Sequence, residues 1–148
     1  MSEFELNGAA LAVALKFVER RERFTSELRQ HLASKGMEDQ ADEVIAHLTR
    51  RRIIDDRRSI QNLIERYAGR RAVGIEKLRA ELTRRGAPEE EVDAALAKVS
   101  ESDKTLDNLL AMKLKPGDGR AKAARFLLSR GFGEEQIESA LNRYFGMD

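Results

Sequence analysis

A glycine preceded by a leucine recurs three times at nearly even spacing along the chain. The glycines are Gly36, Gly86 and Gly131, so the steps are 50 and 45 residues, and a leucine lies four residues before each glycine. Acidic residues follow each glycine, and an aliphatic pair at i, i+4 comes next: Val44 and Leu48, Val92 and Leu96, Ile137 and Leu141. Matches at fixed offsets over a whole chain are typical of tandem architectures. The sequence therefore predicts three copies of one unit.

Each copy has helical periodicity and room for three short helices. Glycine commonly ends a helix because it adopts left-handed dihedrals, and acidic residues oppose the positive end of the next helix dipole. The predicted first helices span residues 8–22, 56–68 and 102–114, the second helices 25–35, 74–85 and 119–130, and the third helices 38–52, 88–98 and 134–145. Lone helices of this length are marginal in water. We therefore predict an all-α fold of three tandem three-helix repeats, 1–54, 55–100 and 101–148, that form an elongated, curved array.

The composition excludes several classes of protein. The chain has no cysteine, so it has neither a disulfide framework nor a thiolate metal site. No apolar run approaches the roughly 18 residues that span a bilayer, and the N-terminus is acidic before its short apolar run, which is wrong for a signal peptide. We expect a cytoplasmic monomer that needs no cofactor and binds no membrane.

No residue pattern typical of catalysis occurs. His31 and His47 lack the spacing of a zinc site, and the chain has no nucleophile elbow, phosphate loop or dinucleotide fingerprint. The acidic clusters at 38–39, 89–91 and 134–135 fit a role at helix N-termini better than a role as metal or catalytic carboxylates. We therefore expect a protein that is not an enzyme and holds no metal.

Basic residues are the remaining functional signal. Residues 1–86 hold 18 Lys/Arg against 14 Asp/Glu, whereas residues 87–148 hold 9 against 12. Arginine dominates the basic half, and its planar fork suits phosphates and carboxylates equally. A solvated helix face explains most single charges, but as a set they indicate an anionic partner. The predicted contact residues are Arg51, Arg57, Arg58, Arg66, Arg70, Arg71, Lys77, Arg79 and Arg84.

Four segments together resemble one known family. They are RRERFTSELRQHLASKG (20–36), LTRRRIIDDRR (48–58), GIEKLRAELTRRGAPEEEVDAAL (74–96) and RAKAARFLLSRGFGEEQIESAL (120–141). Their order, spacing and threefold repetition resemble the RecX family of recombination regulators. The resemblance covers residues 20–141, which is nearly the whole chain.

The chain also departs from the family pattern at several positions. Phe24 stands where the family usually has a serine-like helix cap, and we expect Thr25 to cap the second helix one residue later. Arg52 replaces a glycine before the aliphatic residue and the two aspartates, and Ser59 stands where the family prefers phenylalanine. Val73–Gly74 replaces a Gly-Pro pair.

The resemblance implies three helical repeats and a role in restraining the RecA recombinase. Such a protein is similar to a curved strip that lies in the groove of a RecA–DNA filament and approaches the DNA. That placement would inhibit the ATPase and strand exchange of RecA, and so modulate recombination, DNA repair and the SOS response. Phosphate contacts with single- or double-stranded DNA are expected as well. Two alternatives stay open: a DNA-binding module that acts without RecA, and a helical scaffold for another protein.

Overall fold

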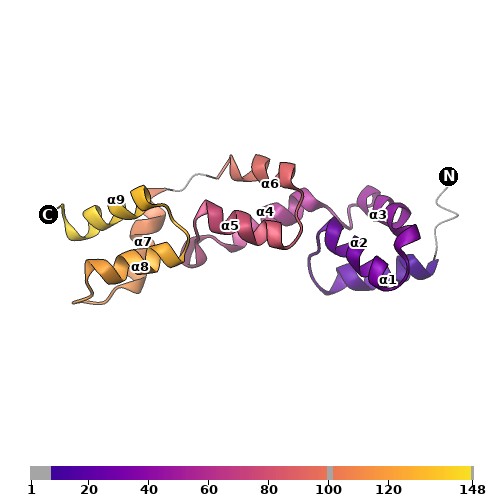
Figure 1. Cartoon of the computed structure of the whole chain (residues 1–148), viewed down its shortest axis with the longest axis horizontal. Coiled ribbons are helices and arrows are strands. Elements are labelled where there is room, and N and C mark those ends of the chain that lie inside the picture. Colours follow the sequence, from indigo (N-terminus) through magenta and orange to yellow (C-terminus); the bar gives the residue numbers. More distant parts are fainter. Residues whose placement is uncertain (1–7, 100–101, 148) are drawn as a thin grey trace. The chain divides into compact units, whose positions relative to one another are not determined.

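The computed structural model describes residues 8–99 and 102–147, and within these ranges the regular structure is entirely helical. Nine α-helices follow one another there (Figure 1): α1 Gly8–Arg20, α2 Thr25–Ser34, α3 Ala41–Arg50, α4 Asp56–Arg66, α5 Ile75–Arg84, α6 Glu89–Leu96, α7 Asp103–Lys113, α8 Arg120–Ser129 and α9 Glu134–Phe145. Two 3-10 turns, η2 (Glu38–Gln40) and η3 (Gly69–Arg71), precede α3 and α5. The predicted all-α fold is confirmed, although α3 begins later than predicted because η2 forms its first turn.

The three glycines end their helices in the same way. Their φ angles are +74° at Gly36, +86° at Gly86 and +85° at Gly131, a region that costs glycine little. The N–H of the following residue then donates to the carbonyl five residues earlier: Met37 to Leu32 at 2.8 Å, Ala87 to Leu82 at 3.0 Å, and Phe132 to Leu127 at 3.4 Å. These bonds are those of the Schellman motif, so the repeated sequence is a repeated helix end.

The described chain divides into two compact units. Unit 1 comprises the described residues up to Gln61 together with Leu82–Val92, and unit 2 comprises Asn62–Glu81 and the described residues from Asp93 onward. The boundary between the units crosses α4, α5 and α6, so these helices contribute residues to both. The division into three repeats stays a prediction, and its second boundary, between residues 100 and 101, lies outside the described residues.

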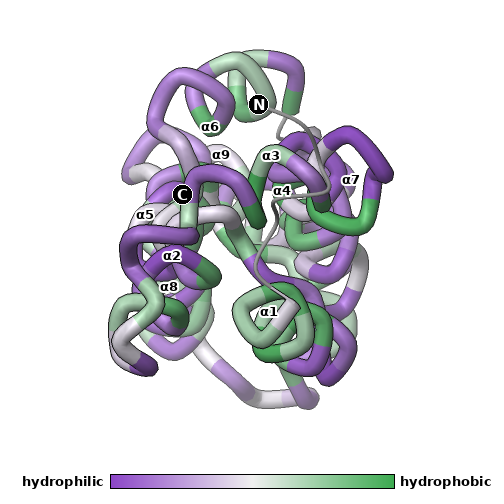
Figure 2. The backbone as a smooth tube through the Cα atoms, turned by 90° about the vertical axis from the view of Figure 1, so that its right-hand side faces the viewer, coloured by the Kyte–Doolittle hydropathy of each residue, from purple (hydrophilic) through white to green (hydrophobic). Residues whose placement is uncertain are grey.

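Unit 1 is built around α1, α2 and α3, which pack pairwise. Figure 2 shows that hydrophobic residues dominate α1, and its two fully buried side chains are alanines, which let α2 and α3 approach closely. The buried cluster consists of Ala10, Ala14, Leu28, Leu32, Ala41, Val44, Ile45, Leu48 and Ile54. It contains the leucine before Gly36 and the aliphatic pair of the first copy, which confirms that these repeated positions form a core.

Unit 2 has a second core, made chiefly by α7, α8 and α9. Its buried residues are Ala72, Leu106, Leu109, Leu110, Leu114, Ala123, Leu127, Phe132, Ile137, Ala140 and Leu141. The leucine before Gly131 and the last aliphatic pair belong to it. Ala72, at the end of η3, joins this cluster, so the segment before α5 is tied to the last three helices.

The start of α2 differs from the sequence prediction. Phe24, with φ −87° and ψ 155°, is the capping residue, so the expectation that Thr25 caps the helix is wrong. Glu27 accepts the N–H of Phe24 at 2.8 Å, and Asp56 of α4 accepts the N–H of Thr25 at 2.8 Å. A carboxylate 31 residues away therefore replaces the missing hydroxyl cap.

Candidate functional site

The nine predicted contact residues fall in both units. Unit 1 holds Arg51, Arg57, Arg58 and Arg84, whereas unit 2 holds Arg66, Arg70, Arg71, Lys77 and Arg79. Their side chains differ in what they already bind within the chain. That difference separates residues that stabilise the fold from residues whose charge is available to a partner.

Three of the unit 1 arginines, Arg57, Arg58 and Arg84, already interact with other residues of the chain. Arg57 Nε lies 2.8 Å from Glu91 Oε2, and this hydrogen bond, with the charge of Glu91, raises the pKa of Arg57. Arg58 donates to the carbonyl oxygens of Arg52 at 3.1 Å and of Ile53 at 3.4 Å, so it satisfies acceptors just beyond the end of α3. Arg51 is exposed and makes no side-chain contact of this kind with the described residues.

Three of the unit 2 residues are also engaged. Arg79 pairs with Asp93 and lies 3.9 Å from a carboxylate oxygen of Glu76. Lys77 Nζ donates to the carbonyl of Ser129 at 2.6 Å, and Arg70 Nε lies 3.2 Å from the sulfur of Met112. Lys77 and Arg70 thus hold the segment around α5 against residues of α7 and α8.

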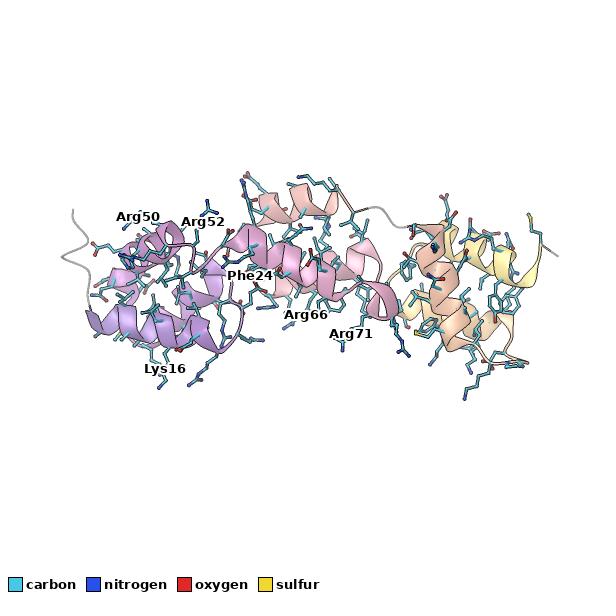
Figure 3. All side chains as sticks on the ribbon, turned by 180° about the vertical axis from the view of Figure 1, so that it is seen from behind. Lys16, Phe24, Arg50, Arg52, Arg66 and Arg71 are labelled. Carbon is cyan, nitrogen blue, oxygen red and sulfur yellow. The ribbon has the colours of Figure 1, made fainter. Side chains whose placement is uncertain are left out.

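Within the predicted set, Arg66 and Arg71 are the unit 2 arginines whose charges stay available. Both are exposed, and within the described residues neither has a carboxylate or hydrogen-bond partner for its guanidinium group. Figure 3 shows both side chains projecting from the same edge of the ribbon in that view. With Arg51 of unit 1, they are the members of the predicted set best suited to bind an external anion.

A second charged feature, which sequence reasoning did not select, lies between α1 and α2. Val13, Lys16, Phe17, Arg20, His31 and Lys35 line a groove of about 320 Å³. Here we call it the α1–α2 groove. The lining positions on α1 follow the i, i+3, i+4, i+7 spacing of one helix face, and this was the available signal.

Aromatic stacking shapes this groove. The ring of Phe17 on α1 stacks on the ring of His31 on α2, with their centres 4.0 Å apart. The guanidinium of Arg23 lies 3.9 Å from the centre of the Phe17 ring. Burial, followed by the charge of Lys35, lowers the pKa of His31, so this imidazole is neutral at pH 7. Burial also lowers the pKa of Arg23.

Two arginines, each just before a repeated glycine, bind segments that lie earlier in the chain. Arg85, just before Gly86, donates to the carbonyl of Glu22 at 2.9 Å and to the Glu27 carboxylate at 3.3 Å. Arg130, just before Gly131, donates to the carbonyls of Arg70 at 3.1 Å and Ala72 at 3.0 Å. The Arg-Gly dipeptide that follows α5 in unit 1 and α8 in unit 2 therefore ties the end of each helix to an earlier segment of the same unit.

Within the described residues, no cluster of histidine and acidic side chains is arranged to hold a metal ion. Among the same residues, no helix is long and apolar enough to cross a membrane.

Comparison with known proteins identifies the family. A model of the first three-helix domain of RecX matches residues 10–48. A regulatory protein RecX of Thermus thermophilus is 34% identical over 129 residues, which cover 86% of each chain. The chain belongs to the RecX family. The regulatory protein RecX of Chlorobium limicola is 30% identical over 151 residues and covers 98% of this chain and 94% of its own.

A solved RecX structure has the same fold. The crystal structure of RecX from Lactobacillus salivarius matches with a TM-score of 0.72 at 20% identity and covers 91% of this chain and 94% of its own. The curated RecX relatives are named regulatory proteins, so the chain is a member of a family of regulators.

Position 52, where the family resemblance implies a glycine, has an unusual backbone. Arg52 adopts φ +58°, and it is the non-glycine residue with positive φ among the described residues. Glycine reaches this region without penalty, so the glycine that the family resemblance implies here would carry no strain. In this chain the position carries an exposed charge, visible in Figure 3, at the cost of backbone strain.

Proposed function

We propose that this chain restrains the RecA recombinase by binding its filament on DNA, and that it inhibits ATP hydrolysis and strand exchange without catalysing a reaction. The observation that carries the proposal is its similarity to a RecX regulatory protein over 86% of both chains. RecX proteins are regulators, and recombination by RecA is the process that the family resemblance implies.

Arg51, Arg66 and Arg71 are the proposed primary contacts with the filament. Their guanidinium groups are exposed and have no carboxylate partner within the described residues, so binding an anion breaks no existing ion pair. Arginine binds carboxylates and phosphates with the same fork, so these residues suit acidic protein surface and DNA backbone alike. Arg57 and Arg79 contribute less directly, because each must first leave a carboxylate of its own chain.

The second candidate is a DNA-binding module that acts without RecA. The excess of Lys/Arg over Asp/Glu in residues 1–86, 18 against 14, favours contact with phosphates. Such binding weakens steeply with salt, by roughly 0.9 log units of affinity per log unit of salt for each phosphate neutralised on duplex DNA.

One titration tests both candidates. Increasing amounts of the chain are added to RecA from the same organism on single-stranded DNA, and ATP hydrolysis and strand exchange are followed. The proposal predicts that both activities fall at a few molecules of the chain per hundred RecA protomers. A different pair of results supports the second candidate and contradicts the first. In that case the chain binds naked DNA with a steep salt dependence, and it has no effect on RecA at concentrations too low to occupy the DNA.

A further inference from the structure

The α1–α2 groove combines an apolar floor with a positively charged rim. Val13 and Phe17 supply apolar surface, while Lys16, Arg20 and Lys35 supply three positive charges. Among the described residues, no acidic side chain lines the groove. Its volume of about 320 Å³ is near the lower end of the range for binding pockets, roughly 300–1,000 Å³. The groove is therefore large enough for one bulky side chain with its neighbours on the rim.

The described part of the chain does not neutralise the rim charges. Lys16, Arg20 and Lys35 are exposed, and within the described residues none of them has a carboxylate within ion-pair distance. Lys16 projects away from α1 in Figure 3. His31 adds no fourth charge, because its lowered pKa keeps it neutral at pH 7. A ligand that carries several negative charges complements such a rim.

Repeat equivalence gives an independent indication of the ligand. Lys35 precedes Gly36, as Arg85 precedes Gly86 and Arg130 precedes Gly131. Arg85 and Arg130 each bind oxygen acceptors on a segment earlier in the chain: a carboxylate and a carbonyl for Arg85, two carbonyls for Arg130.

Lys35 belongs to the first copy, and within the described residues its ammonium group has no such acceptor. At the equivalent positions of the other two copies, the basic side chain binds peptide oxygens or a carboxylate. Lys35 therefore has room for an oxygen acceptor that a partner can supply.

The aromatic geometry argues against a nucleic-acid base in this groove. Single-stranded nucleic acids are held by stacking bases on open aromatic faces. One face of Phe17 is covered by His31 at 4.0 Å, and Arg23 lies over the ring at 3.9 Å. A base would also leave its polar edges without partners against the apolar floor.

A second groove, of about 430 Å³, lies between α8 and α9. Both arginines and glutamates line it, so its charge favours neither anionic nor cationic ligands.

We propose that the α1–α2 groove docks an acidic peptide segment of a protein partner. A central aliphatic or aromatic side chain of that segment fills the apolar floor, and carboxylates on either side bind Lys16, Arg20 and Lys35. The assignment does not depend on RecA being the partner, because it rests on the groove alone.

An array of ten-residue peptides tests this chemistry with the whole 148-residue chain. Each peptide has Leu, Phe or Ser at its centre, flanked either by Asp and Glu or by Asn and Gln. Peptides that bind are then titrated by fluorescence polarisation against the chain, the K16Q/K35Q variant and the K98Q/K104Q variant. The second variant removes the same charge from exposed lysines that do not line the groove.

The proposal predicts binding only by peptides that have both an apolar centre and flanking carboxylates. K16Q/K35Q weakens this binding by about threefold to tenfold, the effect of losing two exposed ion pairs, whereas K98Q/K104Q changes it less than twofold.

Several results overturn the proposal. One is absence of binding, and another is equal binding of Ser-centred or amide-flanked peptides. A third is binding of a twelve-nucleotide oligothymidylate that depends on Lys16 and Lys35, when no peptide binds. That result would show that the groove binds nucleic acid. Binding only by a peptide with the sequence SEFEL, residues 2–6, assigns it to the chain itself.

Discussion

The backbone N–H of Thr25, at the start of α2, donates a 2.8 Å hydrogen bond to Oδ1 of Asp56, the first residue of α4. The neighbouring Asp55 accepts the N–H of Arg58 at 3.2 Å and so caps α4 itself. Two consecutive aspartates therefore serve two helices. This arrangement explains why unit 1 needs no hydroxyl cap at position 24.

Substituting Asp56 tests this shared capping. D56A leaves the Thr25 N–H without its acceptor, and we expect a loss of about 1 kcal/mol in the free energy of unfolding, the usual cost of removing a helix cap. D56N keeps an acceptor oxygen and loses less. Urea unfolding of the three proteins measures the difference, and equal midpoints for D56A and the parent chain would contradict the role of Asp56.

Arg85 and Glu27 form a largely buried ion pair in unit 1. Their closest atoms are 3.3 Å apart, and their side chains are only 11% and 19% exposed. R85A removes the bonds to Glu27 and to the Glu22 carbonyl, so we expect a loss of about 2–3 kcal/mol. A double-mutant cycle with E27Q isolates the pair, and we expect a coupling free energy of about 0.5–3 kcal/mol. Additive effects would show that the two side chains act independently.

The backbone of Arg52 leads us to expect that replacing it with glycine stabilises the fold. Its φ of +58° is costly for a side chain that has a Cβ atom. R52G removes this strain but makes the unfolded chain more flexible, so we expect a net gain of about 0.5–1 kcal/mol.

The neighbouring residue gives a matched control for R52G. Arg51 has φ −87°, so R51G relieves no strain and costs stability. Urea unfolding of R52G and R51G measures the two effects. Changes of the same sign in the two variants would contradict the account of strain at position 52.

Close backbone packing fixes Gly74 in unit 2. Its N–H donates to the carbonyl of Arg130 at 2.7 Å, and a Cβ atom built on it would overlap the carbonyl of Gly131. We expect G74A to cost about 1–3 kcal/mol, because both neighbours are backbone atoms that cannot rotate away. G119A is the control, since a Cβ there meets no atom within 4 Å. Thermal unfolding that is unchanged in G74A would disprove the close approach.

The parts of this fold that the sequence predicts are local. Gly86 ends its helix through bonds within a few residues, so the glycine and its preceding leucine are sufficient signals. The pairing of charges is not local, because Arg57 binds Glu91, which lies 34 residues further along the chain. Sequence reasoning therefore could not separate the paired Arg57 from the unpaired Arg66. It also passed over Lys35, whose role depends on which face of α2 meets α1.

The unpaired arginines give the most direct test of the regulatory function. Arg66 and Arg71 are exposed and make no ion pair with the described residues, so R66E/R71E should leave helicity and thermal unfolding nearly unchanged. If these residues bind acidic protein surface or phosphate, reversal replaces attraction with repulsion, and like charges across an interface cost several kcal/mol. We expect about tenfold or more of the variant to be needed for half-inhibition of RecA strand exchange.

A charge-matched variant makes this test specific. K98E/K104E introduces the same change of charge at exposed lysines in unit 2 and should inhibit like the parent chain. R57E/R79E breaks the pairs with Glu91 and Asp93, so its effect should include a measurable loss of stability. Arg66 and Arg71 make no such pairs with the described residues. A loss of inhibition in R66E/R71E without a change in unfolding therefore shows that these two residues contact the partner. Full inhibition by that variant would exclude them from the contact surface, whatever the other arginines do.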